Sequence, residues 1–290
     1  MAGTLATAAP LRRTRPGHNN AIAFAMVLPA LAVFLLFFAF PVVRMLSLGF
    51  AGGSLAWYGR ALSSPLYLAV FVLTFRMAAA VTVGCLLLGY PTAYLLSTTT
   101  RFWRTTGFLL ILLPFWVSVL VRTYAWMVLL GRNGVINRAL LSAGVIDHPL
   151  PLMYNFVGVL IGMVHVLLPY MILPLYSALR RVDPSLVQAA EGLGATRWRV
   201  FWRIHFPLTL SGVAAGTILV FVLSLGFFIT PALLGGGRVM MIAVLIQQQV
   251  SELLDWNFAA ALSGILLTAT VLAYWFVQAA LERRQQAAGA

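Results

Sequence analysis

The side chains that carry most enzyme chemistry are few in this sequence and lie far apart along it. The 290 residues include six carboxylates, four histidines and a single cysteine, Cys85. General acid–base catalysis needs such groups close together, and metal sites need them as clustered ligands. The carboxylates are Asp147, Asp183, Glu191, Glu252, Asp255 and Glu282, and the histidines are His18, His148, His165 and His205. Because none has the spacing of a catalytic or metal-binding motif, we expect neither an enzyme nor a metal site.

Other chemical motifs are also absent from the sequence. It contains no GxxxxGK[ST] phosphate-binding loop and no HExxH or CxxC motif, so the chain cannot hydrolyse ATP through such a loop by itself. We therefore expect no cofactor in this chain. Proton-coupled transporters usually carry an ionisable relay within the membrane, and here only His165 lies inside an apolar run. A hydrogen-bonded packing residue is the simpler interpretation of that histidine.

The composition is typical of a membrane protein. Hydrophobic residues make up 62% of the chain, charged residues make up 9%, and the mean hydropathy is +0.96. A soluble domain carries about 25% charged residues. The net charge is +13, and the arginines lie between apolar runs rather than on one soluble face, so we expect membrane topology and no nucleic-acid partner. One cysteine permits no intrachain disulfide.

The apolar runs predict an all-α integral membrane protein with six transmembrane helices, since about 20 apolar residues cross a bilayer. The expected spans are residues 21–43, 72–97, 107–130, 155–177, 208–234 and 257–281. A seventh run, Ala61 to Phe75, is short and ends at Arg76, so we expect an interfacial helix leading into the second span. The expected organisation is a basic tail over 1–20, a membrane domain over 21–281 and a second tail over 282–290.

The arginines predict the orientation of these spans, because cytoplasmic loops are enriched in basic residues. The two tails and the loops after the second and fourth spans together hold 12 of the 19 arginines, and the opposite loops hold five. Both termini and the loop 178–207 should therefore be cytoplasmic.

That loop, which contains LVQAAEGLGATRWRVFWRIHFP over residues 186–207, carries strong helix signals. Asp183 can cap a helix that begins with Pro184 and runs over Ser185 to Leu193. Gly194 can adopt the left-handed conformation that ends it, and Thr196 can cap a second helix. The apolar face of the first helix comprises Leu186, Ala189, Ala190 and Leu193. The prediction is a helix–turn–helix contact surface; the alternative is an amphipathic pair lying on anionic lipid.

The spacing in this loop resembles the EAA loop of permeases from bacterial ATP-binding-cassette importers, EAA-x3-G-x9-I-x-L-P. The matching residues are Gln188, Ala189, Ala190, Gly194, Ile204 and Pro207. Two positions depart from the family pattern: Gln188 stands where Glu is usual and Phe206 where Leu is usual. The resemblance implies that this segment, with Glu191 and Ala195, docks on a separate ATPase and couples ATP hydrolysis to transport.

Further segments resemble the first permease subunit of spermidine/putrescine-type importers. They are GYPTAY at 89–94, LPFW at 113–116, VRTYAW at 121–126, GVIN at 134–137 and LPYMILPLY at 168–176. The resemblance implies the MetI-like permease fold in the bacterial inner membrane, acting on a polyamine. It also implies a second homologous permease, an ATPase homodimer that binds ATP and Mg, and a periplasmic or lipid-anchored binding protein.

Five residues are candidates for the substrate path: Trp116, Arg122, Tyr124, Trp126 and Tyr170. An arginine in lipid costs at least about 2.5 kcal/mol, so Arg122 should face a polar path, the bundle interior or the interface. The aromatic rings could hold ammonium groups by cation–π attraction; equally, they could form an interfacial belt. Because no carboxylate lies at depth, an opine or another small organic solute is an alternative to a polyamine. A stand-alone secondary transporter or channel is the alternative from another class.

Overall fold

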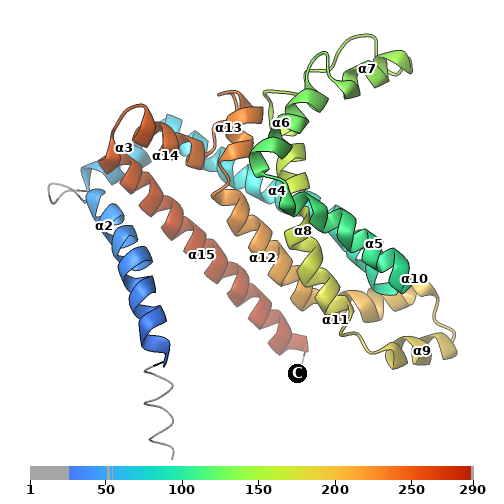
Figure 1. The fold of residues 1–290 in the computed structure, drawn as a ribbon. Coiled ribbons are helices and arrows are strands. Elements are labelled where there is room, and N and C mark those ends of the chain that lie inside the picture. Colours follow the sequence, from blue (N-terminus) through green and yellow to red (C-terminus); the bar gives the residue numbers. More distant parts are fainter. Residues whose placement is uncertain (1–25, 51–52, 54, 289–290) are drawn as a thin grey trace, which may run out of the picture.

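The computed structural model describes residues 26–50, 53 and 55–288, and every regular element among them is a helix (Figure 1). The predicted tail over 1–20 lies outside the described residues. The helices are η1 (Leu35–Ala39), α2 (Phe40–Leu48), α3 (Ala56–Ser63), α4 (Pro65–Thr98), α5 (Arg101–Leu112), η3 (Leu113–Trp116), α6 (Val119–Leu130), α7 (Val135–Ser142), α8 (Phe156–Leu179), α9 (Pro184–Gly192), α10 (Arg197–Val200), η4 (Phe201–His205), α11 (Phe206–Leu208), α12 (Leu210–Leu225), α13 (Ile229–Gly235), α14 (Ile242–Ser251) and α15 (Trp256–Ala288).

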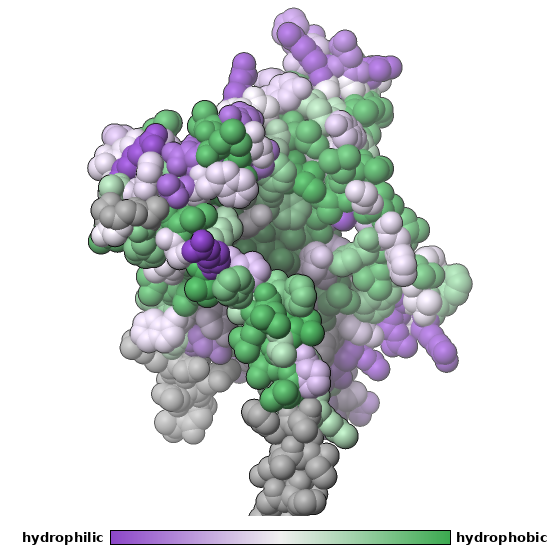
Figure 2. Space-filling view, turned by 60° about the vertical axis from the view of Figure 1, so that its left-hand side comes forward, coloured by the Kyte–Doolittle hydropathy of each residue, from purple (hydrophilic) through white to green (hydrophobic). Residues whose placement is uncertain are grey.

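Four helices of the described residues are long and apolar enough to cross a membrane: Met26–Leu48, Pro65–Thr98, Phe156–Leu179 and Trp256–Phe276. Two bent pairs bring the number to six if each pair forms one span. Hydrophobic residues occupy the middle of the molecule, and hydrophilic residues gather towards its upper and lower ends (Figure 2). This distribution fits a bundle that crosses a bilayer lengthwise.

Two of the predicted spans are not single straight helices. The third, 107–130, is broken between Trp116 and Val119, where Arg101–Trp116 and Val119–Ser142 meet at 101°. Pro114 lies in the last turn before the break, and the Ser118 side chain accepts a hydrogen bond from the Leu120 N–H to start α6. The fifth, 208–234, ends as α12 at Leu225 and resumes as α13 at Ile229.

The predicted interfacial helix over Ala61 to Phe75 is wrong. Residues up to Ser63 belong to the short helix α3, and α4 then begins at Pro65 and continues without a break to Thr98. Pro65 occupies the first helical position, which suits proline because its missing N–H has no partner there in any helix. Arg76 lies within α4 and is exposed, so the charge does not mark the end of a helix.

The core lies where α4, α8 and α12 cross. Met163, Leu167 and Met171 of α8 are buried at its centre. Gly212 and Gly216 of α12 let this helix approach α8 closely: a methyl group on Gly212 would collide with the side chain of Ala178, and one on Gly216 would lie 2.7 Å from the Met171 sulfur. These three helices therefore pack as one body.

A second cluster holds the upper ends of α3, α4, α14 and α15 together around the buried Phe258. Arg60 lies 4.5 Å above the Phe258 ring and 3.5 Å from the Asp255 carboxylate. The Ile242 N–H donates to the hydroxyl of Thr74, which is fully buried, and so ties α14 to α4. The first helix, Met26–Leu48, contacts α15 only near its upper end and otherwise stands apart from the bundle (Figure 1).

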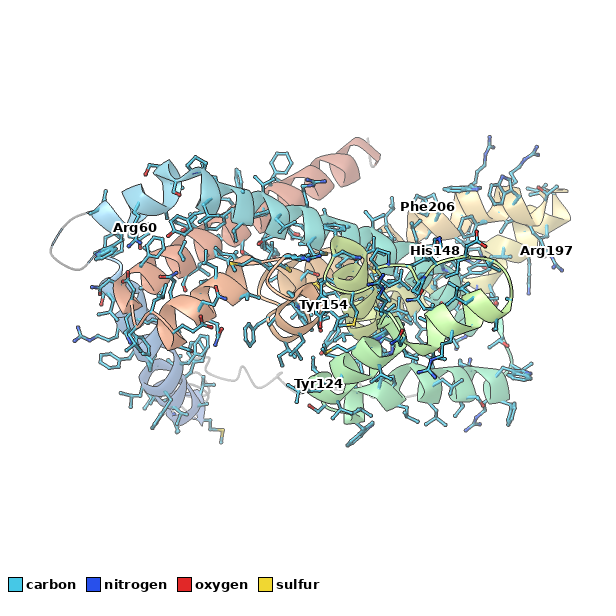
Figure 3. The ribbon with its side chains drawn as sticks, turned by 90° about the horizontal axis from the view of Figure 1, so that it is seen from above. Arg60, Tyr124, His148, Tyr154, Arg197 and Phe206 are labelled. Carbon is cyan, nitrogen blue, oxygen red and sulfur yellow. The ribbon has the colours of Figure 1, made fainter. Side chains whose placement is uncertain are left out.

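The loop that contains α9 and α10 lies at the lower end of the bundle, as does the end of α15 (Figure 1). The helices α3, α7 and α14 lie at the opposite end. From above, Arg60 and Arg197 lie at opposite sides of the molecule (Figure 3). The predicted assignment of this lower end to the cytoplasm stays a prediction.

Candidate functional site

The loop 178–207 folds into the predicted pair of helices, with the predicted caps. The Ser185 N–H donates to Asp183 Oδ1 at 2.8 Å, Pro184 is the first residue of α9, and the backbone hydrogen bond holds the pKa of Asp183 below its ordinary value. The Arg199 N–H donates to the Thr196 hydroxyl at 3.4 Å at the start of α10. Both helices are thus capped by the side chain of the residue directly before them.

Gly194 ends α9 in the left-handed conformation, with φ of +80°. Its N–H donates to the Glu191 carbonyl at 2.9 Å, and the Ala195 N–H donates to the Ala190 carbonyl at 3.0 Å. These two bonds define a Schellman motif, which satisfies the carbonyls at the end of a helix. The turn between α9 and α10 is therefore a fixed structure rather than a flexible connection.

The apolar face predicted for α9 is turned away from the rest of the chain. Leu186 is 47% exposed and Leu193 is 90% exposed, and Ala189 is also exposed. Gln188 and Glu191 are exposed beside them. The part of this surface at Leu186, Ala189 and Leu193 is thus open, whereas Ala190 behind it is half-buried.

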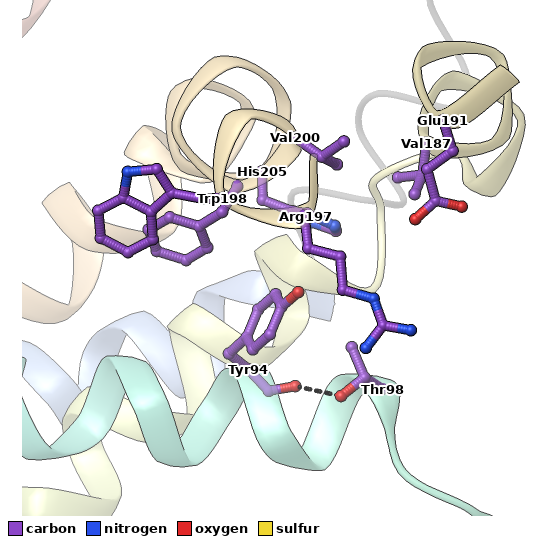
Figure 4. Close-up of a pocket in the computed structure, with 9 residues that line it drawn as sticks. Tyr94, Thr98, Val187, Glu191, Arg197, Trp198, Val200 and His205 are labelled. Carbon is purple, nitrogen blue, oxygen red and sulfur yellow. Dashed lines mark hydrogen bonds between the residues drawn. The ribbon is translucent and has the colours of Figure 1, made fainter. Parts of the chain in front are cut away.

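The inner side of the loop encloses a pocket against the lower end of α4 (Figure 4). Its volume is about 710 Å³, and Tyr94 and Thr98 of α4 form one wall. Glu191 of α9 and Arg197 of α10 lie on the other walls without an ion pair between them. The Thr98 hydroxyl donates to the Tyr94 carbonyl at 3.1 Å, which directs it along α4.

The second helix of the loop runs from Arg197 through α10, η4 and α11 to Leu208. Val200 is buried, whereas Trp198 is 71% exposed. Ile204 and Pro207 of the predicted coupling motif lie in this helix, Ile204 half-buried and Pro207 exposed just before the bend into α12. At that bend, Arg197–Leu208 and Leu210–Leu225 meet at 61°.

The five residues proposed for the substrate path differ in exposure, and their role stays a prediction. Trp116 is 91% exposed at the end of η3, and Tyr124 is 49% exposed on α6. Arg122, Trp126 and Tyr170 are half-buried on α6 and α8. Tyr170 packs against Phe115, with the ring centroids 5.1 Å apart. The Nε atom of Arg122 is buried without a hydrogen-bond partner among the described residues.

Two interactions join helices whose contact the sequence did not predict, and the first confirms that His165 is hydrogen-bonded. Trp126 Nε1 donates to His165 Nδ1 at 3.1 Å, which joins α6 to α8 beside an apolar pocket of about 460 Å³. Phe201 and Phe206 pack on Tyr90 of α4. The second contact has a sequence signal, because GYPTAY places two tyrosines four residues apart on one helical face.

Comparison with known proteins gives the family. A family model described as "Binding-protein-dependent transport system inner membrane component" matches residues 1–286. The permease protein PotB of the spermidine/putrescine transport system of Escherichia coli K12 is 37% identical over 226 residues, covering 77% of this chain and 82% of PotB. The molybdenum transport system permease protein ModB of Mycobacterium bovis is 32% identical over 218 residues, covering 73% of this chain and 78% of ModB.

Solved structures show the same fold. A chain of a bacterial alginate importer, solved with a periplasmic protein bound to an alginate pentasaccharide, superposes with a TM-score of 0.72 at 19% identity, covering 89% of this chain and 93% of that one. A chain of an amino acid transporter solved with histidines gives a TM-score of 0.52 at 14% identity, covering 78% of this chain and 97% of that one. The chain belongs to the family of inner-membrane permease components of binding-protein-dependent transport systems, and has their MetI-like fold.

Proposed function

We propose that this chain forms half of the transport path of a polyamine importer and is driven by a separate ATPase that docks on its loop 178–207. One observation carries the docking part of the proposal. The outward face of α9 is apolar and exposed at Leu186 and Leu193, although both ends of the helix are fixed by caps. A small apolar face on a rigid helix suits insertion into a groove of another protein.

The ATPase belongs to the proposal because the sequence has no phosphate-binding loop of its own. An ATPase homodimer would carry the ATP and Mg, one copy on this loop and the other on a second, homologous permease. The solute would reach the permeases from a binding protein outside the membrane; the alginate structure pairs a permease of the same fold with such a protein. This chain would then do no catalysis of its own.

The polyamine substrate is supported by the relatives named for spermidine and putrescine, which are 37% identical to this chain. Tyr124 and Trp126 on α6 and Tyr170 on α8 offer aromatic faces for ammonium groups. Arg122 repels a polycation, and no carboxylate of the sequence lies within α4, α6, α8 or α12. We therefore expect the second permease or the binding protein to supply the negative charge. An opine or another small organic acid is the competing substrate, and it would pair with Arg122 directly.

The docking proposal is tested by replacing Leu193 with Asp. The side chain is 90% exposed, so the permease should still fold and insert, but the charge should weaken association with the ATPase measured by co-purification. Leu253, which is 66% exposed at the other end of the molecule, provides the matched control as Leu253→Asp. Equal co-purification of both variants with the ATPase would refute docking on this face.

The substrate and the transporter class are tested separately. Binding of spermidine, putrescine and an opine to the partner binding protein, measured by calorimetry, should favour the polyamines. In proteoliposomes, uptake should require the ATPase, the second permease and ATP. Uptake by this chain alone would instead establish a secondary transporter or channel.

A further inference from the structure

The GYPTAY segment of α4 contacts the loop 178–207, called the coupling loop from here on for its proposed role, through a set of packed aromatic rings. Phe201 of η4 lies between Tyr90 and Tyr94: its ring centroid is 5.7 Å from the first and 5.6 Å from the second, and both pairs are nearly perpendicular. Phe206 packs on Tyr90 at 6.0 Å, and His205 packs edge-on against Tyr94 at 5.4 Å. We call these five residues the aromatic joint.

The backbone of the loop is shaped to make this contact. Residues Phe201–His205 form a π turn, in which the Phe206 N–H donates to the Phe201 carbonyl. A π turn widens the helix, so that residues five apart lie on the same side, and such turns are frequent at functional sites. Here Phe201 and Phe206, five residues apart, both reach Tyr90.

A hydrogen bond fixes the joint to the bend between the loop and α12. Thr209 lies at the 61° bend and is fully buried. Its hydroxyl lies 2.9 Å from the His205 carbonyl oxygen and 2.9 Å from the Tyr90 hydroxyl. Because a carbonyl oxygen can only accept, the Thr209 hydroxyl donates to the backbone carbonyl of His205. The Tyr90 hydroxyl then donates to the Thr209 oxygen.

The helix that receives this contact cannot move by itself. Next to Tyr90, a methyl group added to Gly89 would lie only 3.0 Å from the side chain of Met171 of α8, and Met171 in turn packs on Gly216 of α12. Close-packed helices of this kind transmit a displacement rather than absorb it. A displacement of the loop that reaches Tyr90 therefore reaches α4 and α8 together with α12.

We propose that Tyr90, Tyr94 and Thr209 are positioning residues for transport: they fasten the coupling loop to α4, so that the loop and the three-helix body move together. Without these contacts, the chain would bend at Thr209 when the loop moves, and the helices that line the transport path would not move with it. The inference rests on the proposed function, because it assumes that an ATPase moves the loop. It adds the residues inside the permease that carry the motion onward.

The test measures uptake per ATP hydrolysed by the complete importer in proteoliposomes. Thr209→Val keeps the shape of the side chain and removes the hydroxyl, and Tyr90→Phe removes only the donor. Each variant should lower uptake per ATP about two- to tenfold, the size expected from one buried hydrogen bond. The double variant should be no worse than Thr209→Val alone, because Tyr90→Phe removes only a bond that Thr209→Val has already removed.

Two controls separate coupling from folding. Thr209→Ser retains the hydroxyl and should keep the wild-type ratio of uptake to hydrolysis. Thr92→Val removes a hydroxyl from the same GYPTAY motif, but that hydroxyl bonds to the Leu88 carbonyl of its own helix at 2.7 Å, so the ratio of uptake to hydrolysis should also stay at the wild-type value.

Equal ratios in Tyr90→Phe, Thr209→Val and the wild type would overturn the inference. A loss of ATPase co-purification in these variants that Thr209→Ser shares would also overturn it, because the role would then be structural. Failure of the wild-type chain to associate with any ATPase is a different result, and it would refute the proposed function instead.

Discussion

Gly194 provides the most direct test of how the coupling loop is built. Its φ of +80° lies in the left-handed region, which costs an L-residue with a side chain about 1–2 kcal/mol. A Cβ added at Gly194 would meet no atom within 4 Å. A substitution there therefore strains the backbone without a steric clash, and it places its side chain on the exposed surface.

The prediction is that Gly194→Asp abolishes uptake and the stimulation of ATP hydrolysis while the permease still inserts in the membrane. Asp tolerates the left-handed region better than most residues, so the backbone contributes about 1 kcal/mol at most. A penalty of that size lowers the equilibrium constant for forming the native turn by about fivefold at room temperature. The larger effect is the charge, which would have to be buried against the ATPase without a partner. Gly194→Asn, which shares the shape but lacks the charge, should retain partial activity.

The chain contains a matched control for the backbone effect. Gly144 ends α7 at the opposite end of the molecule with φ of +66° and the same pair of bonds, from Gly144 N–H to the Leu141 carbonyl and from Val145 N–H to the Leu140 carbonyl. It too has open space around it. Gly144→Asp should leave ATPase co-purification unchanged. Normal uptake by Gly194→Asp, or equal losses of ATPase association in both variants, would refute the coupling role of the 178–207 loop.

Two further predictions follow from other polar groups. Gln188 is exposed on α9, so Gln188→Glu should insert normally and match or exceed the wild type in ATPase co-purification; a large loss would show that its departure from the family pattern is required. Asn137 is fully buried, accepts from the Leu150 N–H and donates to the carbonyls of Gly131 and Leu150. Asn137→Leu leaves these backbone groups without hydrogen-bond partners and should destabilise the segment 131–150 by about 2–4 kcal/mol. The expected result is faster proteolysis of that segment without loss of ATPase association, and unchanged proteolysis would contradict the prediction.

The coupling loop was largely predictable because its signals are local. Asp183 followed by Pro184, the glycine at 194 and Thr196 each act within one helical turn, and the structure places a cap or a helix end at each. The same logic was available for the break in the third span. Ser118 caps α6 and Pro114 precedes it. Both lie inside an apolar run, however, and the high mean hydropathy of that run predicts one continuous span.

Other features depend on contacts that no local pattern reveals. Arg76 marked the end of a helix in the sequence, yet the apolar residues before it, from Pro65 onward, extend α4. The exposure of the substrate-path candidates is another such feature, since Trp116 is 91% exposed whereas the Nε atom of Arg122 is buried. The partner of Trp126 is His165, 39 residues away. These two residues, far apart in the sequence, come into contact because α6 packs on α8.

The coupling loop combines two properties that a simple connection between spans does not need. Its turn is held by a Schellman motif and by side-chain caps at both helix starts, so it keeps its shape when pushed. Its outer face at Leu193 is apolar and unpacked, while its inner face is fastened to α4 through Phe201. A linker gains nothing from ordering these residues, because ordering costs about 1–2 kcal/mol for each backbone unit. An element that transmits motion between two proteins must be rigid, with one face free to bind the partner and the other packed on the helix bundle. The loop has this arrangement, which is the physical reason to place the ATPase contact at α9.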